Sequence, residues 1–310
     1  MKPIILKQAW PGVVAALIVA LPFIIPGFYI HLLNEFLILA FFAVSFNLVF
    51  GYGRMVSIGH AAFYAVGGYS CGLLMKKLGI SLPLALLSSA VLAALVGLVI
   101  GYFSIRLTGF YLAFISLAFA QLVWVVIWKW YDVTGGDNGL IGIPVPSLIS
   151  SPTQVWRFYY FTLIIVGLCI FILWRITRSS FGFSLRATSQ NPERTEFVGI
   201  NVMKIRLLAW VISAFFSGIA GCLMVLSIGG AYPNMAHFEM TLEVTLMALV
   251  GGMYTFLGPI VGSAILVFLH YLITLFTEYW MIFMGTILLI IILFLPNGVV
   301  GYVRERLARG

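Results

Sequence analysis

The sequence has very few charged residues for its length. Asp, Glu, Lys and Arg make up 8% of the 310 residues, against about 25% in an ordinary soluble domain. A globular protein of this size needs a polar surface, and so few charged side chains cannot supply one. The composition therefore excludes a soluble enzyme. The 63% of hydrophobic residues indicates a polytopic membrane protein whose outer surface contacts lipid.

The sequence also lacks the motifs of common nucleotide and metal sites. A phosphate-binding loop needs Gly-Lys before Ser or Thr, and this chain has no Gly-Lys dipeptide. It has no His-Glu-x-x-His and no Cys-x-x-Cys, and its three cysteines lie inside apolar runs. We therefore expect no enzymatic activity, no metal site and no cofactor in this chain. If ATP drives the protein, another chain must bind it.

Apolar runs between charges mark the candidate membrane spans. A bilayer core of about 30 Å is crossed by about 20 helical residues. The candidate runs are residues 13–30, 33–50, 56–75, 82–103, 108–128, 158–174, 207–228, 241–253, 257–276 and 279–295. The sequence thus predicts an all-α transmembrane bundle of about ten spans, with about eight as the lower bound, forming one domain over residues 1–310.

Two of these runs, 56–75 and 241–253, are unlike the others. The first is interrupted by glycines, and the second is short and carries a Gly-Gly pair near its end. Broken backbone at membrane depth occurs where it is buried in protein or lines a watery cavity, and a pair of such segments points to a solute pathway. The alternative is that the glycines serve only close helix packing. The candidate pathway residues are Gly59, His60, Glu243, Gly251 and Gly252.

The basic residues are unevenly distributed along the chain. If ten spans start from a cytoplasmic N-terminus, the stretch 175–206, with six basic and two acidic residues, falls on the cytoplasmic side. Arg54, Arg106 and the basic C-terminal tail fall there too, as the positive-inside rule requires. On the opposite side, Lys129 and Arg157 are balanced by Asp132 and Asp137, so that only Lys76 and Lys77 depart from the rule. The charge pattern therefore predicts an even number of spans and both termini in the cytoplasm.

The cytoplasmic loop 175–206 is predicted to contain a short helix. Asn191 is a plausible N-cap and Pro192 suits the first helical position. Glu193 follows in the first turn, and Gly199 can end the helix in a left-handed conformation. A helix of about two turns with an apolar side cannot bury itself and favours a groove in a partner. The alternative is a surface helix that rests on lipid headgroups.

Five motifs, in the same order, resemble one known family. They are residues 47–69 (beginning Asn-Leu-Val-Phe-Gly-Tyr-Gly), 134–144 (Thr-Gly-Gly-Asp-Asn-Gly-Leu-Ile-Gly-Ile-Pro), 199–221 (beginning Gly-Ile-Asn-Val), 249–262 (Leu-Val-Gly-Gly-Met-Tyr-Thr-Phe-Leu-Gly-Pro-Ile-Val-Gly) and 295–301 (Leu-Pro-Asn-Gly-Val-Val-Gly). Together they resemble the LivM-like permease of branched-chain amino-acid ABC importers.

The resemblance implies a set of partners and a location. A second, homologous permease would complete the channel, two cytoplasmic ATPase subunits would bind ATP and Mg, and a periplasmic binding protein would deliver Leu, Ile or Val. The chain would lie in the bacterial inner membrane, in contact with lipid and not with nucleic acid.

The resemblance also assigns a role to the short helix. It would be the coupling helix that meets an ATPase, with the candidate contacts Asn191, Pro192, Glu193, Glu196, Phe197 and Gly199. The family often has Glu-Asn-Glu where this chain has Gln190, Asn191 and Pro192. Two alternatives remain: an importer of the same architecture for urea, short amides or another amino-acid-like solute, and a stand-alone channel or ion-coupled carrier. An ion-coupled carrier would usually carry several acids deep in the bundle, and this chain has at most one or two.

Overall fold

The computed structural model of the chain describes residues 22, 26–146, 149, 155–277, 279–294 and 298–309. These residues are mostly helical. The longer helices are α2 (Gly27–Asn47), α3 (Ala61–Leu78), α4 (Leu82–Ser104), α5 (Phe110–Lys129), α7 (Val155–Arg178), α8 (Ser180–Gln190), α10 (Val202–Ile228), α11 (Phe238–Gly251), α12 (Gly258–Thr274), α13 (Trp280–Phe294) and α14 (Gly298–Arg309). The short elements are the π-helix η2 (Leu48–Tyr52), α6 (Tyr131–Thr134), the 3₁₀ turns η3 (Gly136–Asn138) and η4 (Pro233–Ala236), α9 (Pro192–Phe197), and the strands β1 (Leu140–Ile141) and β2 (Gly230–Ala231).

Within the described residues, five helical segments are long and apolar enough to cross a membrane. They are Gly27–Tyr52, Leu82–Ser104, Phe110–Lys129, Trp156–Arg178 and Val202–Ile228. The shorter helix α12 is also apolar. These helices confirm the predicted all-α polytopic bundle.

One predicted boundary is wrong. The apolar runs place the boundary between the first two spans near His31, but α2 runs without a break from Gly27 to Asn47. His31 is exposed on the side of this helix, so a single polar residue there does not require a turn. Residues 13–21 and 23–25 of the first predicted span lie outside the described residues.

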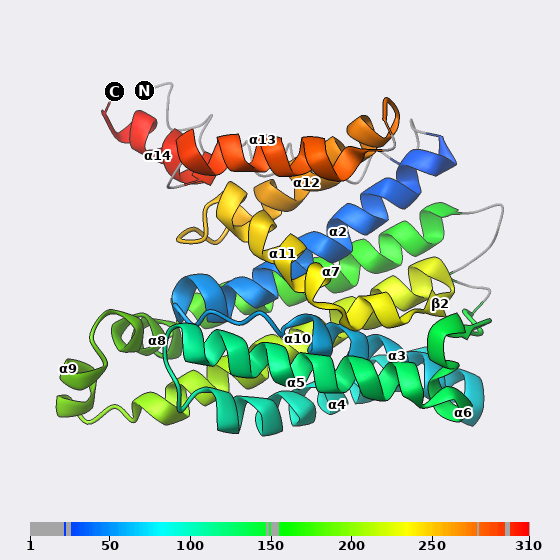
Figure 1. The fold of residues 1–310 in the computed structure, drawn as a ribbon, viewed down its shortest axis with the longest axis horizontal. Helices are drawn as coiled ribbons and strands as arrows, with labels where there is room; N and C mark the ends of the chain where they lie inside the picture. The colour runs from blue at the N-terminus through cyan, green and yellow to red at the C-terminus, as the bar shows by residue number, and fades with distance from the viewer. Residues whose placement is uncertain are drawn as a thin grey trace.

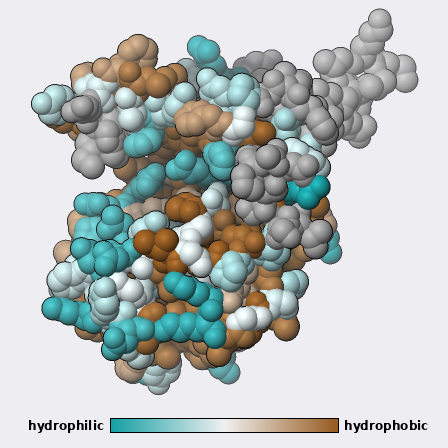
Figure 2. Space-filling model, turned by 90° about the vertical axis from the view of Figure 1, so that its right-hand side faces the viewer, coloured by the Kyte–Doolittle hydropathy of each residue, from teal (hydrophilic) through white to brown (hydrophobic). Residues whose placement is uncertain are grey.

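The helices lie roughly along the long axis of the molecule, and the two ends differ (Figure 1). One end carries α8, α9 and the turn between α4 and α5, and the other carries α6 and β2. The basic stretch 175–206 therefore lies at the same end as Arg106 in the α4–α5 turn. At the opposite end, hydrophilic residues spread over the face around a hydrophobic group in its middle (Figure 2).

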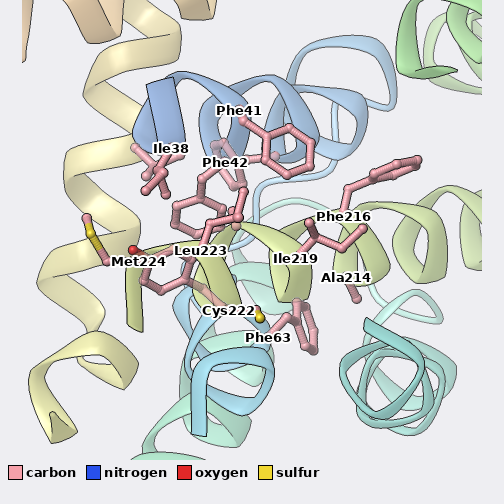
Figure 3. Close-up of a cluster of buried hydrophobic side chains, with 14 of the residues drawn as sticks. Ile38, Phe41, Phe42, Phe63, Ala214, Phe216, Ile219, Cys222, Leu223 and Met224 are labelled. Carbon is pink, nitrogen blue, oxygen red and sulfur yellow. The ribbon is translucent and has the colours of Figure 1, made fainter. Parts of the chain in front are cut away.

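Helix α10 forms the centre of the core, between α2 and α3 (Figure 3). Its Leu223 is fully buried, as are Phe42 on α2 and Phe63 on α3. Close packing matters here because lipid is as apolar as these side chains, so that fit rather than burial drives the contact. Glycine makes the fit possible: a Cβ on Gly221 would overlap the carbonyl oxygen of Tyr64. The missing side chain at Gly221 thus lets α10 and α3 approach each other closely.

The two unusual runs are broken outside their helices rather than within them, since α3 continues from Ala61 to Leu78 and α11 from Phe238 to Gly251. Residues 53–60 are mostly non-helical and largely buried, and only then does α3 begin. The short helix α11 likewise follows an irregular stretch made of β2 and η4. The two meet where the backbone N–H of Ala61 donates to the Thr241 hydroxyl over 2.9 Å. The non-helical backbone is thus buried in protein, as an apolar surrounding requires.

Local hydrogen bonds account for Lys76 and Lys77, the two lysines that depart from the positive-inside rule. At the end that carries α6, β1 pairs with β2 in antiparallel register, Leu140 opposite Ala231. Lys76 donates to the carbonyl oxygen of Ile141 over 2.6 Å, and Lys77 to that of Asp132 over 2.9 Å. Both lysines lie in the last turn of α3, where a positive charge also interacts favourably with the helix dipole. They therefore have a local structural role on this side.

Candidate functional site

Helix α9 forms where the sequence predicts a short capped helix. The Asn191 side-chain oxygen accepts from the backbone N–H of Arg194 over 2.9 Å, and Pro192 is the first helical residue. After the helix, Gly199 has a φ of 87° and donates its N–H to the Glu196 carbonyl over 2.8 Å. Only glycine adopts this φ without strain. The cap and the stop are therefore confirmed.

Most of α9 faces away from the protein. Thr195 is its buried residue, while Glu193, Glu196 and Phe197 are exposed and line a small open pocket. Phe197 is 91% exposed and the next residue, Val198, is 77% exposed. An acidic first turn beside two exposed apolar side chains at the tip of the molecule is a surface suited to a protein partner.

Removing the cap should loosen α9 alone. We expect Asn191→Ala to destabilise this helix by about 1 kcal/mol, because the Arg194 N–H loses its acceptor. The amides of residues 193–197 should then exchange about fivefold faster, as measured by hydrogen exchange on the purified chain. Asn191→Asp keeps an acceptor and is the matched control. Equal acceleration in both variants would show that the cap does not hold the helix.

Helix α8 is not predicted from the sequence, in which residues 175–206 form a loop with one helix. Its composition gives little signal, because Ser, Gly and Thr are poor helix formers. Tertiary contacts hold it instead: Gly182, Leu185 and Thr188 form one buried face. The segment is thus a helical pair, α8 and α9, rather than a loop. This pair is called the α8–α9 foot below.

The pathway candidates near the first broken span are buried. A Cβ on Gly59 would overlap the carbonyl oxygen of Ser116 on α5. His60 is fully buried, its Nε2 lies 2.7 Å from the Ser213 hydroxyl on α10, and its Nδ1 lies 3.4 Å from that of Ser57. Ser213 donates in turn to the carbonyl oxygen of Ser45 on α2. His60 therefore ties the non-helical segment to two spans in this conformation.

The pathway candidates on the second broken span, Glu243, Gly251 and Gly252, lie at two different places. Glu243 is exposed on the second turn of α11, close to the point where Thr241 meets α3. Gly251 and Gly252 lie eight and nine residues further on, about 12 Å along the helix. A Cβ on Gly251 would overlap the carbonyl oxygen of Gly258 on α12, and Gly252 has a φ of 112°. These glycines form the tight corner between α11 and α12.

The chain contains one Gly-x-Ser-x-Gly pentapeptide, residues 68–72. In hydrolases this pattern places an exposed nucleophilic serine on a sharp strand-to-helix turn. Here the five residues lie inside α3, and the Ser70 hydroxyl donates to the carbonyl oxygens of Val66 and Gly67. The local structure is therefore not that of a nucleophile elbow.

The contacts of three residues at the α8–α9 foot, Arg186, Arg206 and Tyr52, are not indicated by the sequence. Arg186 and Arg206 donate to backbone carbonyls of neighbouring elements, and the Arg186 guanidinium lies over the ring of Tyr52. Tyr52 is far from the two arginines in the chain, and nothing in the basic stretch distinguishes a buried arginine from an exposed one. Only the packing of α8 against η2 shows their role.

The apolar spans, the broken helices and the exposed capped helix define a multi-pass membrane transport subunit. Comparison with known families agrees: the model described as the permease component of the branched-chain amino acid transport system matches residues 28–292. The chain belongs to this family. It is therefore a permease of the ABC importer type, a component that works with other transporter subunits.

Several curated proteins are similar to the chain. The high-affinity branched-chain amino acid permease LivM of Escherichia coli K12 is 27% identical over 94% of this chain and 74% of its own length. A probable LivM of Methanocaldococcus jannaschii is 24% identical over 83% of this chain and 89% of its own length. The galactofuranose transporter permease YtfT of E. coli K12 is 28% identical over 77% and 70%. No solved structure matches the chain.

Proposed function

We propose that this chain is the LivM-type permease of an importer for branched-chain amino acids. It would lie in the bacterial inner membrane with both termini and the α8–α9 foot in the cytoplasm. A second permease would complete the channel, two ATPase subunits would bind ATP and Mg, and a periplasmic protein would deliver the solute. Family membership and the LivM relatives support this proposal.

The observation that carries the proposal is the exposed tip of α9. Phe197 and Val198 present apolar surface beside the acids Glu193 and Glu196. Such a short amphipathic helix is the usual shape of a segment that docks into a partner's groove. In the proposed mechanism, ATP binding and hydrolysis in the partner displace the foot, and the bundle then opens alternately to its two sides.

The solute pathway is proposed to run past the start of α11. Glu243 is exposed there and lies within electrostatic range of Glu35 on α2 and of the Tyr64 hydroxyl. A carboxylate at membrane depth is costly and marks a pathway by default. Acidic groups suit the ammonium of an amino acid, while the aliphatic side chain can follow the apolar wall. His60 and Gly59, which are buried in the segment before α3, would hold the start of α3 beside this part of the pathway.

The proposed solute, a branched-chain amino acid, has an alternative among the relatives of this chain. The galactofuranose permease among the relatives belongs to a sugar transporter, and the same architecture could take urea or short amides. A neutral solute can form only hydrogen bonds with Glu35 and Glu243, whereas the ammonium of a zwitterion also forms an ion pair with a carboxylate. This difference favours an amino acid.

The full complex, reconstituted in liposomes with its binding protein, tests the proposal. We expect ATP-dependent uptake of labelled leucine, isoleucine and valine, and at least about tenfold less uptake of urea, acetamide and galactofuranose, a difference of about 1.4 kcal/mol. The permease should bring the ATPase subunits with it when purified. Accumulation of solute by the chain alone in liposomes would contradict the proposal, and preferred uptake of a sugar or amide would overturn the solute.

A further inference from the structure

Two arginine side chains attach α8 to the ends of two spans. Arg186 on α8 donates to the carbonyl oxygen of Thr177, near the end of α7, over 2.7 Å. Arg206, in the second turn of α10, donates to the carbonyl oxygen of Thr188 on α8 over 3.1 Å. Both arginines are partly buried, and hydrogen bonds from a charged donor are stronger than neutral ones. The foot is therefore fixed to α7 and α10 at its base.

Arg186 also contacts a third span. Its Cζ lies 4.9 Å from the centre of the Tyr52 ring and 5.3 Å from that of Phe183. Tyr52 is the last residue of η2, the π-helical turn that extends α2. A guanidinium over an aromatic face is attracted by the ring's electrons, and more strongly where water is displaced. Through this one side chain the foot reaches α2.

The π-helical turn in turn packs against the loop 252–257, which joins α11 to α12. Asn47, just before η2, donates from Nδ2 to the carbonyl oxygen of Thr255 over 3.4 Å. A Cβ on Gly51 would overlap the carbonyl oxygen of Met253, and Arg54 lies 5.5 Å from the centre of the Tyr254 ring. The turn therefore contacts this loop through both backbone and side-chain atoms.

We infer that Arg186 and Tyr52 are positioning residues that transmit a displacement of the α8–α9 foot to η2 and, through residues 252–257, to the α11–α12 pair. This inference rests on the proposed function, in which a partner moves the foot. Coupling between distant sites can be carried by a chain of packed side chains and hydrogen bonds with rigid elements between them. The contacts from Thr177 to Thr255 form such a set. The π-helix adds a point where backbone geometry is irregular, as is common at functional sites.

The test uses the complete complex in liposomes and measures labelled leucine uptake and ATP hydrolysis in the same sample. We expect Tyr52→Leu and Arg186→Gln each to lower the uptake per ATP hydrolysed by about fivefold or more, because the ring–guanidinium contact is lost. The ATPase subunits should still co-purify and basal hydrolysis should persist. Tyr52→Phe keeps the ring and should behave like the parent, which makes it the matched control.

A merely structural role predicts a different pattern. It would lower the yield of complex, hydrolysis and uptake together, so that uptake per ATP stays constant, and this result would overturn the inference. The double variant gives a second criterion, since it should be no worse than the more severe single variant if the two residues act through one contact. Effects that multiply would show that they act separately.

Hydrogen exchange on the isolated permease adds a readout that does not depend on transport. Arg186→Gln should speed exchange of amides in residues 48–57, because its contact with the Tyr52 ring is lost, whereas Asn191→Ala should not. Unchanged exchange at 48–57 would overturn the inference. Failure of the parent complex to take up leucine, with this exchange effect present, would instead count against the proposed function.

Discussion

Replacing Phe197 by Asp is expected to abolish ATP-dependent uptake while the helical bundle stays folded. The side chain is 91% exposed, and surface substitutions of this kind usually change stability by only about 0.5 kcal/mol or less. In the proposed complex the same ring would be buried in a groove of an ATPase subunit. Loss of such an anchor commonly costs about 2–4 kcal/mol, which corresponds to a roughly 30-fold or greater loss of affinity.

The measurement is leucine uptake together with the amount of ATPase that co-purifies. Phe197→Leu keeps an apolar side chain of similar reach and should retain most of both. Thermal unfolding of the isolated permease should be the same for the parent and for both variants, since Phe197 packs on nothing within the described chain. Normal uptake by Phe197→Asp would place the docking surface elsewhere and would remove the main support for the proposed role of α9.

Local signals explain why α9 could be predicted. Its start and end depend on residues within a few positions of one another: Asn191 accepts from Arg194, and Gly199 bonds back to Glu196. The long spans are predictable for a similar reason, because length and apolar character decide them. Where a boundary depended on one polar residue, as at His31, the prediction failed.

The other parts of the site depend on contacts between distant residues, which no local pattern reports. His60 meets Ser213, which lies 153 positions away. Helix α8 has a weak intrinsic preference and is held by Arg186, Arg206 and a buried face. The π-helical turn has no sequence signature at all. The sequence marks the glycines, but whether each one serves packing or a pathway depends on what lies opposite.

Gly251→Ala separates these two roles for the glycine at the α11–α12 corner. The added Cβ would overlap the backbone carbonyl of Gly258, and a backbone atom cannot turn aside as a flexible side chain can. Overpacking of this kind costs about 1–3 kcal/mol or more. We expect the thermal midpoint of the purified permease to fall by about 5 °C and the yield from membranes to drop with it.

Gly167→Ala is the same chemical change at a place with space for it. Gly167 lies on α7 and a Cβ there would meet nothing within 4 Å, so the midpoint should hold or rise, since alanine favours a helix over glycine by about 1 kcal/mol. If Gly251→Ala kept a normal midpoint but lost uptake, the glycine would serve the pathway and not the packing. If it lowered the midpoint while the surviving complexes transported normally, the pathway would lie at the other end of α11, beside Glu243. That second outcome is the one the backbone contact with Gly258 favours, because a corner filled by two backbones leaves no room for a solute.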